Sequence, residues 1–135
     1  MKLILVFVGG GIGSVLRYST GLMIGRWTPT DAQTPHWLSM YPVATLLVNL
    51  IGCGLIGLAW GLLGDPEEGN EALRVALIVG VLGGFTTFSS FGWETIDLMN
   101  NGKAGTAMIY VSLSVCVGLF AAWSGHAAGL VLSGG

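Results

Sequence analysis

Residues 83–91 read Gly-Gly-Phe-Thr-Thr-Phe-Ser-Ser-Phe, inside an apolar stretch, 75–93, that carries no charged side chain. That stretch is long enough to cross a bilayer as a helix. Adjacent glycines loosen a helix, and free carbonyls are tolerated at membrane depth only when they are buried in protein or line a cavity. We therefore predict a helix broken at mid-membrane. The break, the hydroxyls and the paired rings of Phe88 and Phe91 together indicate an ion pathway.

The composition places the chain among membrane proteins. Of its 135 residues, 53% are hydrophobic and only 9% are charged, which is too few charges to cover a soluble globule. The 23 glycines suit closely packed membrane helices. The net charge of −2 argues against a nucleic-acid partner.

Four apolar stretches are each long enough to span a hydrocarbon core of about 30 Å at a rise of about 1.5 Å per residue. We predict an all-α membrane protein with transmembrane helices near 2–26, 41–63, 72–99 and 103–131, which form a single domain over 1–135. The third of these helices is the one with the predicted break.

Both cysteines fall in the middle of predicted helices. Cys53 and Cys116 could form a disulfide only if those two helices adjoin, and the sequence does not show whether they do. We expect two free, buried thiols that act as small hydrophobic side chains.

Positive charges near the helix ends are balanced between the two membrane faces. Lys2 and Arg74 flank one face, and Arg26 and Lys103 flank the other. An excess of lysine and arginine on one side sets orientation, and this chain has no excess. We therefore predict insertion in both orientations and an antiparallel, dual-topology homodimer, since four helices of this size enclose little interior.

The sequence lacks a catalytic constellation, and we predict that the chain is not an enzyme. His36, in a predicted loop, and His126, near the C-terminus, have no nearby nucleophile or carboxylate in the sequence. No side chains have metal-ligand spacing. The glycines of 9–13 fit helix packing better than a nucleotide loop, because no strand precedes them.

Two polar residues inside predicted spans have alternative interpretations. Arg17 either reaches a membrane face or pairs with a carboxylate, or else it makes an electropositive approach that concentrates anions. Asn49 either bonds to a neighbouring helix or points an amide donor into a pore, with the Thr45 hydroxyl one turn away.

Aromatic rings and hydroxyls complete the candidate pathway. The positive ring edges of Phe88 and Phe91 can attract an anion weakly. Tyr110 and Ser114 share a helix face and either bond their own helix carbonyls or extend a polar lane. We expect Glu94 to lie in a water-filled vestibule. The candidate pore and anion-binding residues are Arg17, Thr45, Asn49, Phe88, Ser89, Ser90, Phe91, Glu94, Tyr110 and Ser114.

Three segments resemble one family across essentially the whole chain. Residues 83–91 closely resemble the GG-x-TTFSTF segment of the Fluc (CrcB) fluoride channels. Residues 9–18 resemble the family's GG-x-x-G-x-x-x-RY pattern, and 45–52 resemble its TL-x-VN-x-x-G pattern. Ala44 stands where the family usually has glycine, and Ser90 where it usually has threonine.

The resemblance implies a fluoride-specific channel that lets fluoride leave the cytoplasm passively. It implies a multi-pass protein of the bacterial cell inner membrane, an antiparallel homodimer with two pores. Asn49 would be a pore donor, and Phe88 and Phe91 of both subunits would form the pore walls. The backbone carbonyls of Gly83 and Thr86 would hold one central sodium ion, which is structural and not transported.

Two other classes of protein compete with a channel. A small four-helix drug exporter needs a carboxylate inside its cavity, yet the first two predicted spans hold no Asp or Glu, and their deep ionisable group is Arg17. A non-conducting assembly factor would not explain the donors gathered around Phe88 and Phe91. The residues by themselves reach only to a small, weakly coordinated anion, and fluoride rests on the resemblance.

Overall fold

The computed structural model describes residues 1–27, 40–64 and 70–134, and all regular structure in these parts is helical. Its elements are α1 (Lys2–Trp27), α2 (Met40–Leu63), α3 (Glu71–Arg74), the π-helix η3 (Val75–Leu82), α4 (Gly83–Phe85), α5 (Phe88–Asn100) and α6 (Ala104–Ser133). The predicted loop with His36 lies outside the described residues.

Four helical segments are long and apolar enough to cross a membrane. They are Lys2–Gly25, Pro42–Leu63, Glu71–Asn100 and Ala104–Ser133. The shortest has 22 residues, which at about 1.5 Å per residue exceeds a hydrocarbon core of about 30 Å. The prediction of an all-helical protein with four long apolar helices is therefore confirmed.

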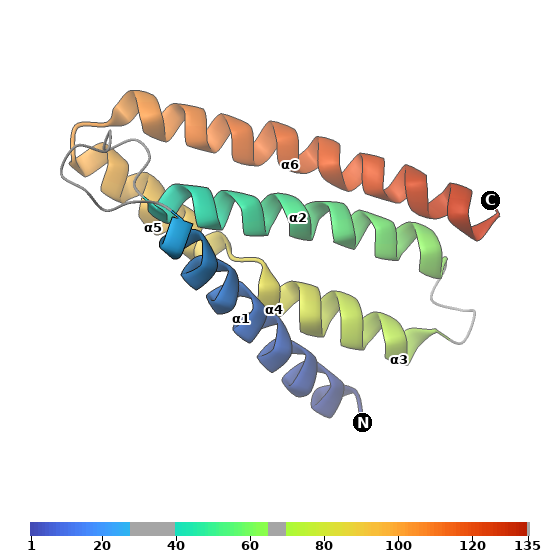
Figure 1. The fold of residues 1–135 in the computed structure, drawn as a ribbon. Coiled ribbons are helices and arrows are strands. Elements are labelled where there is room, and N and C mark those ends of the chain that lie inside the picture. The colour runs from blue at the N-terminus through green and yellow to red at the C-terminus, as the bar shows by residue number, and fades with distance from the viewer. Residues whose placement is uncertain (28–39, 65–69, 135) are drawn as a thin grey trace.

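The helices associate as two pairs. In Figure 1, α2 and α6 lie side by side along most of their length, and α1 lies beside η3 and α4. The third span links the pairs, because η3 and α4 pack on α1 while α5 continues toward α6. A turn at Gly102, whose φ of 73° suits glycine, connects α5 to α6.

Glycines bring the backbones of α2 and α6 into direct contact. A Cβ atom on Gly57 would overlap the carbonyl oxygen of Ala122, and one on Gly129 would lie 2.6 Å from that of Leu58. Small residues at such a contact allow the close approach on which helix association in lipid depends.

Glycines also bring the backbones of α1 and the third span into direct contact. A Cβ atom on Gly9 would lie 2.7 Å from the carbonyl oxygen of Ala76, and one on Gly84 would overlap that of Gly10. At the end of this pair, Lys2 Nζ and Glu71 Oε1 form an exposed ion pair of 2.5 Å. Such a pair contributes little to stability by itself, so the glycine contacts hold these helices together.

The third span is helical on either side of two extended residues. Thr86 has φ −80° and ψ 159°, and Thr87 has φ −150° and ψ 117°. The π-helix η3 and the short helix α4 precede these two residues, and α5 begins immediately after them, at Phe88. We call residues 86 and 87 the interruption. Its position at the membrane midplane stays a prediction.

The outer surface is mostly apolar, whereas few side chains are fully buried. Phe7 is 81% exposed and Val131 is 76% exposed, while Val48, between the helices, is only 2% exposed. Exposed apolar surface of this extent suits contact with lipid or with another protein.

The two cysteines are free thiols in different surroundings. Cys53 is half-buried, but Cys116 is exposed on α6. The expectation that both thiols are buried is therefore wrong for Cys116, because no helix of the described residues covers this face of α6.

Candidate functional site

The side chain of Asn49, on α2, forms two hydrogen bonds with the interruption. Asn49 Nδ2 donates to the Thr87 carbonyl oxygen at 3.0 Å, and the Thr87 backbone N–H donates to Asn49 Oδ1 at 2.9 Å. The Asn49 side-chain amide thus satisfies both the N–H and the C=O of Thr87, which compensates for the helical hydrogen bonds lost there. One Nδ2 proton remains for a further acceptor.

Thr87 also caps α5. Its Oγ1 accepts from the backbone N–H of Ser90 at 3.2 Å and donates to Ser90 Oγ at 3.0 Å. The Ser89 hydroxyl lies 3.3 Å from the same Oγ1. A threonine in this position satisfies one of the free donors at a helix N-terminus.

Thr86 is held differently, by the helix that precedes it. Its backbone N–H and its Oγ1 both donate to the Leu82 carbonyl oxygen, at 3.0 Å and 2.9 Å. Its methyl group occupies the space that a Cβ atom on Gly52 would need. A glycine at position 52 therefore lets the interruption approach α2.

A carboxylate is buried one and a half turns along α5. Glu94 is 8% exposed, and its two oxygens accept from Thr45 Oγ1 and from Tyr110 OH, each at 2.7 Å. The hydroxyl donors come from α2 and α6, so this network ties three helices together. Each oxygen of the buried carboxyl group thus has its own hydroxyl donor, which offsets part of the cost of burying it.

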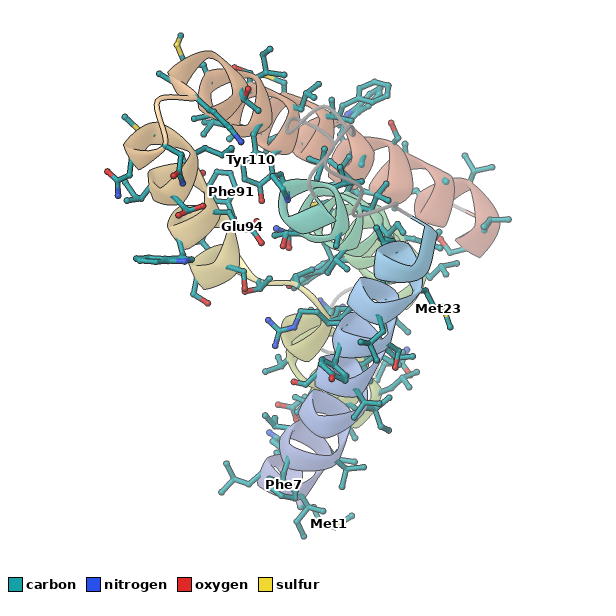
Figure 2. The ribbon with its side chains drawn as sticks, turned by 60° about the vertical axis from the view of Figure 1, so that its left-hand side comes forward. Met1, Phe7, Met23, Phe91, Glu94 and Tyr110 are labelled. Carbon is teal, nitrogen blue, oxygen red and sulfur yellow. The ribbon has the colours of Figure 1, made fainter. Side chains whose placement is uncertain are left out.

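An aromatic row leads from the surface to this network. The ring centroids of Phe88 and Phe91 are 5.6 Å apart, and those of Phe91 and Tyr110 are 5.2 Å apart. Figure 2 shows Phe91 and Glu94 on α5 close to Tyr110 on α6, far from Phe7 at the opposite end of the molecule. The outer ring of the row, Phe88, is 83% exposed.

Two cavities lie against the interruption. The smaller, about 290 Å³, is lined by Asn49, Phe88, Phe91 and Ser114 among others, and none of its described lining residues is acidic. The Ser114 hydroxyl oxygen is buried there without a hydrogen-bond partner in the structure. This cavity therefore combines amide and hydroxyl donors with aromatic rings.

The larger cavity, about 690 Å³, is lined by Arg17, Thr45, Ser90 and Glu94 among others. Arg17 and Glu94 share this space, yet no ion pair joins these two described side chains. Among the cavity's described lining residues, the Arg17 guanidinium is the one cation and the Glu94 carboxyl group is the one acid.

The predicted site residues thus gather in one region. Around the interruption the structure places Thr45, Asn49, Phe88, Ser89, Ser90, Phe91, Glu94, Tyr110 and Ser114, with Arg17 in the adjoining cavity. Their part in binding an anion stays a prediction. Glu94 lines the larger cavity, where it is buried and accepts hydrogen bonds from two hydroxyl groups, and its place in a water-filled vestibule stays a prediction.

Sequence reasoning did not single out Thr87 or Gly52. The signal for Thr87 was local and weak, since threonine is favoured at an N-cap but the Glu or Gln three residues later is replaced by Ser90. The contact of Gly52 with Thr86 joins residues far apart in the chain, so no local signal exists for it.

The described part of the site has no side-chain cluster suited to a metal ion. Within residues 1–27, 40–64 and 70–134, no group of three or more His, Cys, Asp or Glu side chains could hold a metal ion. Its chemistry consists of hydrogen-bond donors, ring edges, backbone carbonyls and one buried carboxylate. Together with the four apolar helices, it defines a multi-pass helical membrane protein.

Comparison with known sequences identifies the family. The family described as "CrcB-like protein, Camphor Resistance (CrcB)" matches residues 4–126. A relative from Flavobacterium psychrophilum, named "Fluoride-specific ion channel FluC", is 42% identical over 120 residues, which cover 89% of this chain and 90% of the relative. The chain belongs to the CrcB family.

Other relatives of the same name extend the match. One from Pseudomonas putida is 43% identical over 120 residues, covering 89% of this chain and 90% of its own length. One from Thermus thermophilus is 40% identical over 133 residues, covering 98% of both chains. These relatives are named as channels, and the family is not one of enzymes.

Proposed function

We propose that this protein is a fluoride-specific ion channel that lets fluoride leave the cytoplasm passively across a bacterial inner membrane. The observation that carries the proposal is the cavity of about 290 Å³ beside the interruption, where amide and hydroxyl donors meet two phenylalanine rings. The names of the relatives support fluoride among small anions.

The proposed path uses weak contacts throughout. Arg17 raises the anion concentration in the larger cavity, and the hydroxyls of Ser89 and Ser90 replace part of the hydration shell. The anion then passes the ring edges of Phe88 and Phe91, which attract it without binding it tightly. Transit needs binding that is strong enough for entry and weak enough for exit.

The working unit is proposed to be an antiparallel homodimer with two pores, made from chains of both orientations. Phe88 belongs to the proposed pore wall but is 83% exposed in a single chain, so a second chain has to cover it. The equal division of Lys2 and Arg74 against Arg26 and Lys103 allows both orientations.

A central sodium ion is proposed at the interruption, with the backbone carbonyls of Gly83 and Thr86 of each subunit as ligands. The residues fit a hard cation, because carbonyl oxygens are suitable ligands and these two have lost their helical donors. In a continuous helix they would accept from Thr87 and Ser90, whose N–H groups donate elsewhere. Bound sodium supplies a fixed positive charge near the anion path, and it is structural rather than transported.

Ion flux from liposomes tests the function. Purified full-length protein is reconstituted into vesicles loaded with potassium fluoride or potassium chloride, and valinomycin starts the efflux that an ion-selective electrode follows. We expect rapid loss of fluoride and retention of chloride. Vesicles that retain fluoride would leave an assembly factor as the better explanation, and proton-coupled cation exchange would indicate an exporter.

Added lysines test dual topology. Three lysines appended after Gly135 should force most chains into one orientation and lower fluoride efflux from cells. Co-expression with a chain that carries extra lysines in the turn 100–102 should restore efflux. Cysteine labelling from each side reports orientation directly, and labelling of unmodified chains from one side only would contradict the proposal.

A further inference from the structure

Two side chains at the interruption hold backbone N–H groups that a continuous helix would use for its own hydrogen bonds. The N–H of Thr87 donates to a side chain of α2, and the N–H of Ser90 donates to the Thr87 hydroxyl. We infer that Asn49 and Thr87 are positioning residues that keep two backbone carbonyls open for the structural cation. This inference rests on the sodium site proposed above.

The first carbonyl is that of Gly83. In an α-helix the N–H of residue 87 donates to the carbonyl of residue 83. Here Asn49 Oδ1 accepts that N–H at 2.9 Å, and Asn49 Nδ2 holds the Thr87 carbonyl oxygen at 3.0 Å. The two bonds together keep the Thr87 backbone away from Gly83, so the helix cannot close over the Gly83 carbonyl.

The second carbonyl is that of Thr86. In an α-helix it would accept from the N–H of Ser90. That N–H donates instead to Thr87 Oγ1 at 3.2 Å. The Thr87 hydroxyl therefore keeps the Thr86 carbonyl free of its helical N–H donor, as Asn49 keeps the Gly83 carbonyl free.

The energetic reason is the cost of unpaired buried donors. If either acceptor is removed, its N–H loses a partner away from water, which favours a return to the helical bond. The helical bond would place an N–H on the carbonyl oxygen that the cation needs. Loss of these side chains should therefore weaken cation binding even where the protein stays folded.

The experiment measures sodium binding through stability. The full-length protein is purified in detergent without sodium, and its melting temperature is followed as sodium chloride replaces N-methyl-D-glucamine chloride. For Thr87→Val we expect the half-maximal sodium concentration to rise about tenfold, the effect of losing one cap. Thr87→Ser keeps the hydroxyl and should respond like the unmodified protein.

Thr95→Val is the matched control on the same helix. The Thr95 hydroxyl bonds to the Phe91 carbonyl oxygen within α5 and does not touch the interruption. Its replacement should leave the sodium response unchanged. An equal rise in Thr95→Val and Thr87→Val would mean that general loss of a threonine hydroxyl, rather than the cap, is responsible, and would overturn the inference.

Substitutions at Asn49 distinguish its effect on sodium binding from its effect on fluoride passage. Asn49→Asp keeps the acceptor for the Thr87 N–H and loses only the donor to the Thr87 carbonyl oxygen, so it should keep most of the sodium response. Fluoride efflux should fall, because a negative charge enters the anion path. Asn49→Leu has no acceptor and should lose both. A merely structural role would make the two readouts fall together in both variants.

The outcomes distinguish this inference from the sodium site itself. If the unmodified protein shows no sodium response, the proposed site and the inference are both wrong. If it responds and Thr87→Val and Asn49→Leu respond equally well, the site stands and the inference is wrong. If Thr87→Val does not fold, the two Asn49 variants decide the question in the same way.

Discussion

The contact between α2 and α6 and the interruption in the third span bring helices together by different means. Between α2 and α6 the backbones touch, because glycines such as Gly57 and Gly129 leave no side chain in between. At the interruption, side chains such as Asn49 and Glu94 reach across and bond to a neighbouring helix.

This difference predicts which property each region controls. A backbone contact cannot adjust to an added atom, so substitutions there should affect folding. A hydrogen-bonded network can lose one member and keep its helices in place, so substitutions there should affect ion passage more than folding. Each variant below is therefore measured by both melting temperature in detergent and fluoride efflux from liposomes.

The largest effect is expected from Gly57→Ala. Its Cβ atom would overlap the Ala122 carbonyl oxygen, which cannot move aside without moving α6. We expect destabilisation by about 3 kcal/mol or more, with loss of most folded protein during purification. Gly54→Ala, on the same helix, adds a Cβ atom 3.9 Å from its nearest contact and should be tolerated. Equal melting temperatures for the two variants would contradict the close contact.

The second largest effect is expected from Phe88→Ile, and it concerns fluoride efflux rather than stability. Phe88→Ile removes the positive ring edge and keeps apolar bulk, so we expect efflux to fall at least about tenfold, or about 1.4 kcal/mol in the barrier, with little change in melting temperature. Phe7→Ile is the control, since Phe7 is 81% exposed against 83% for Phe88 but lies far from the interruption. If efflux falls equally in both, exposure to lipid explains the loss and Phe88 is not a pore residue.

A smaller effect on both readouts is expected from Tyr110→Phe. It deletes one of the two hydroxyl donors to Glu94, which should lower stability by about 1 kcal/mol. The bond from Thr45 remains, so efflux should fall less than in Phe88→Ile. Tyr18→Phe serves as the comparison, since Tyr18 is 69% exposed. No difference in melting temperature between these variants would show that water replaces the lost donor.

The smallest effect is expected from Ser133→Ala. The Ser133 hydroxyl lies 2.9 Å from the Leu130 carbonyl oxygen within α6 and 3.3 Å from the Gly61 carbonyl oxygen on α2, at the exposed end of α6. We expect a change within about 0.5 kcal/mol and normal efflux, as for most exposed positions. A large loss in melting temperature would mean instead that the bond from Ser133 to Gly61 holds this end of α6 to α2.

Some site residues could be predicted from local pattern, but their partners could not. Phe88 and Phe91 share a face by their spacing, and their rings are indeed 5.6 Å apart. Asn49 was open to two interpretations, and its amide bonds to Thr87, which is 38 residues away. Glu94 was expected in a vestibule, yet its bonds to Thr45 and Tyr110 bury it. Pairing across helices depends on how the helices pack, and spacing along one helix does not contain that information.

The sequence by itself determined the four long helices, because an apolar run of sufficient length in lipid has to satisfy its own backbone by forming a helix. It also determined where polar groups gather, since the hydroxyls and rings of 83–91 are adjacent in the chain. Only the tertiary structure decided which groups bond to one another. The glycine contacts set the distances between backbones, and those distances bring Asn49 to Thr87 and Glu94 to its two hydroxyl donors.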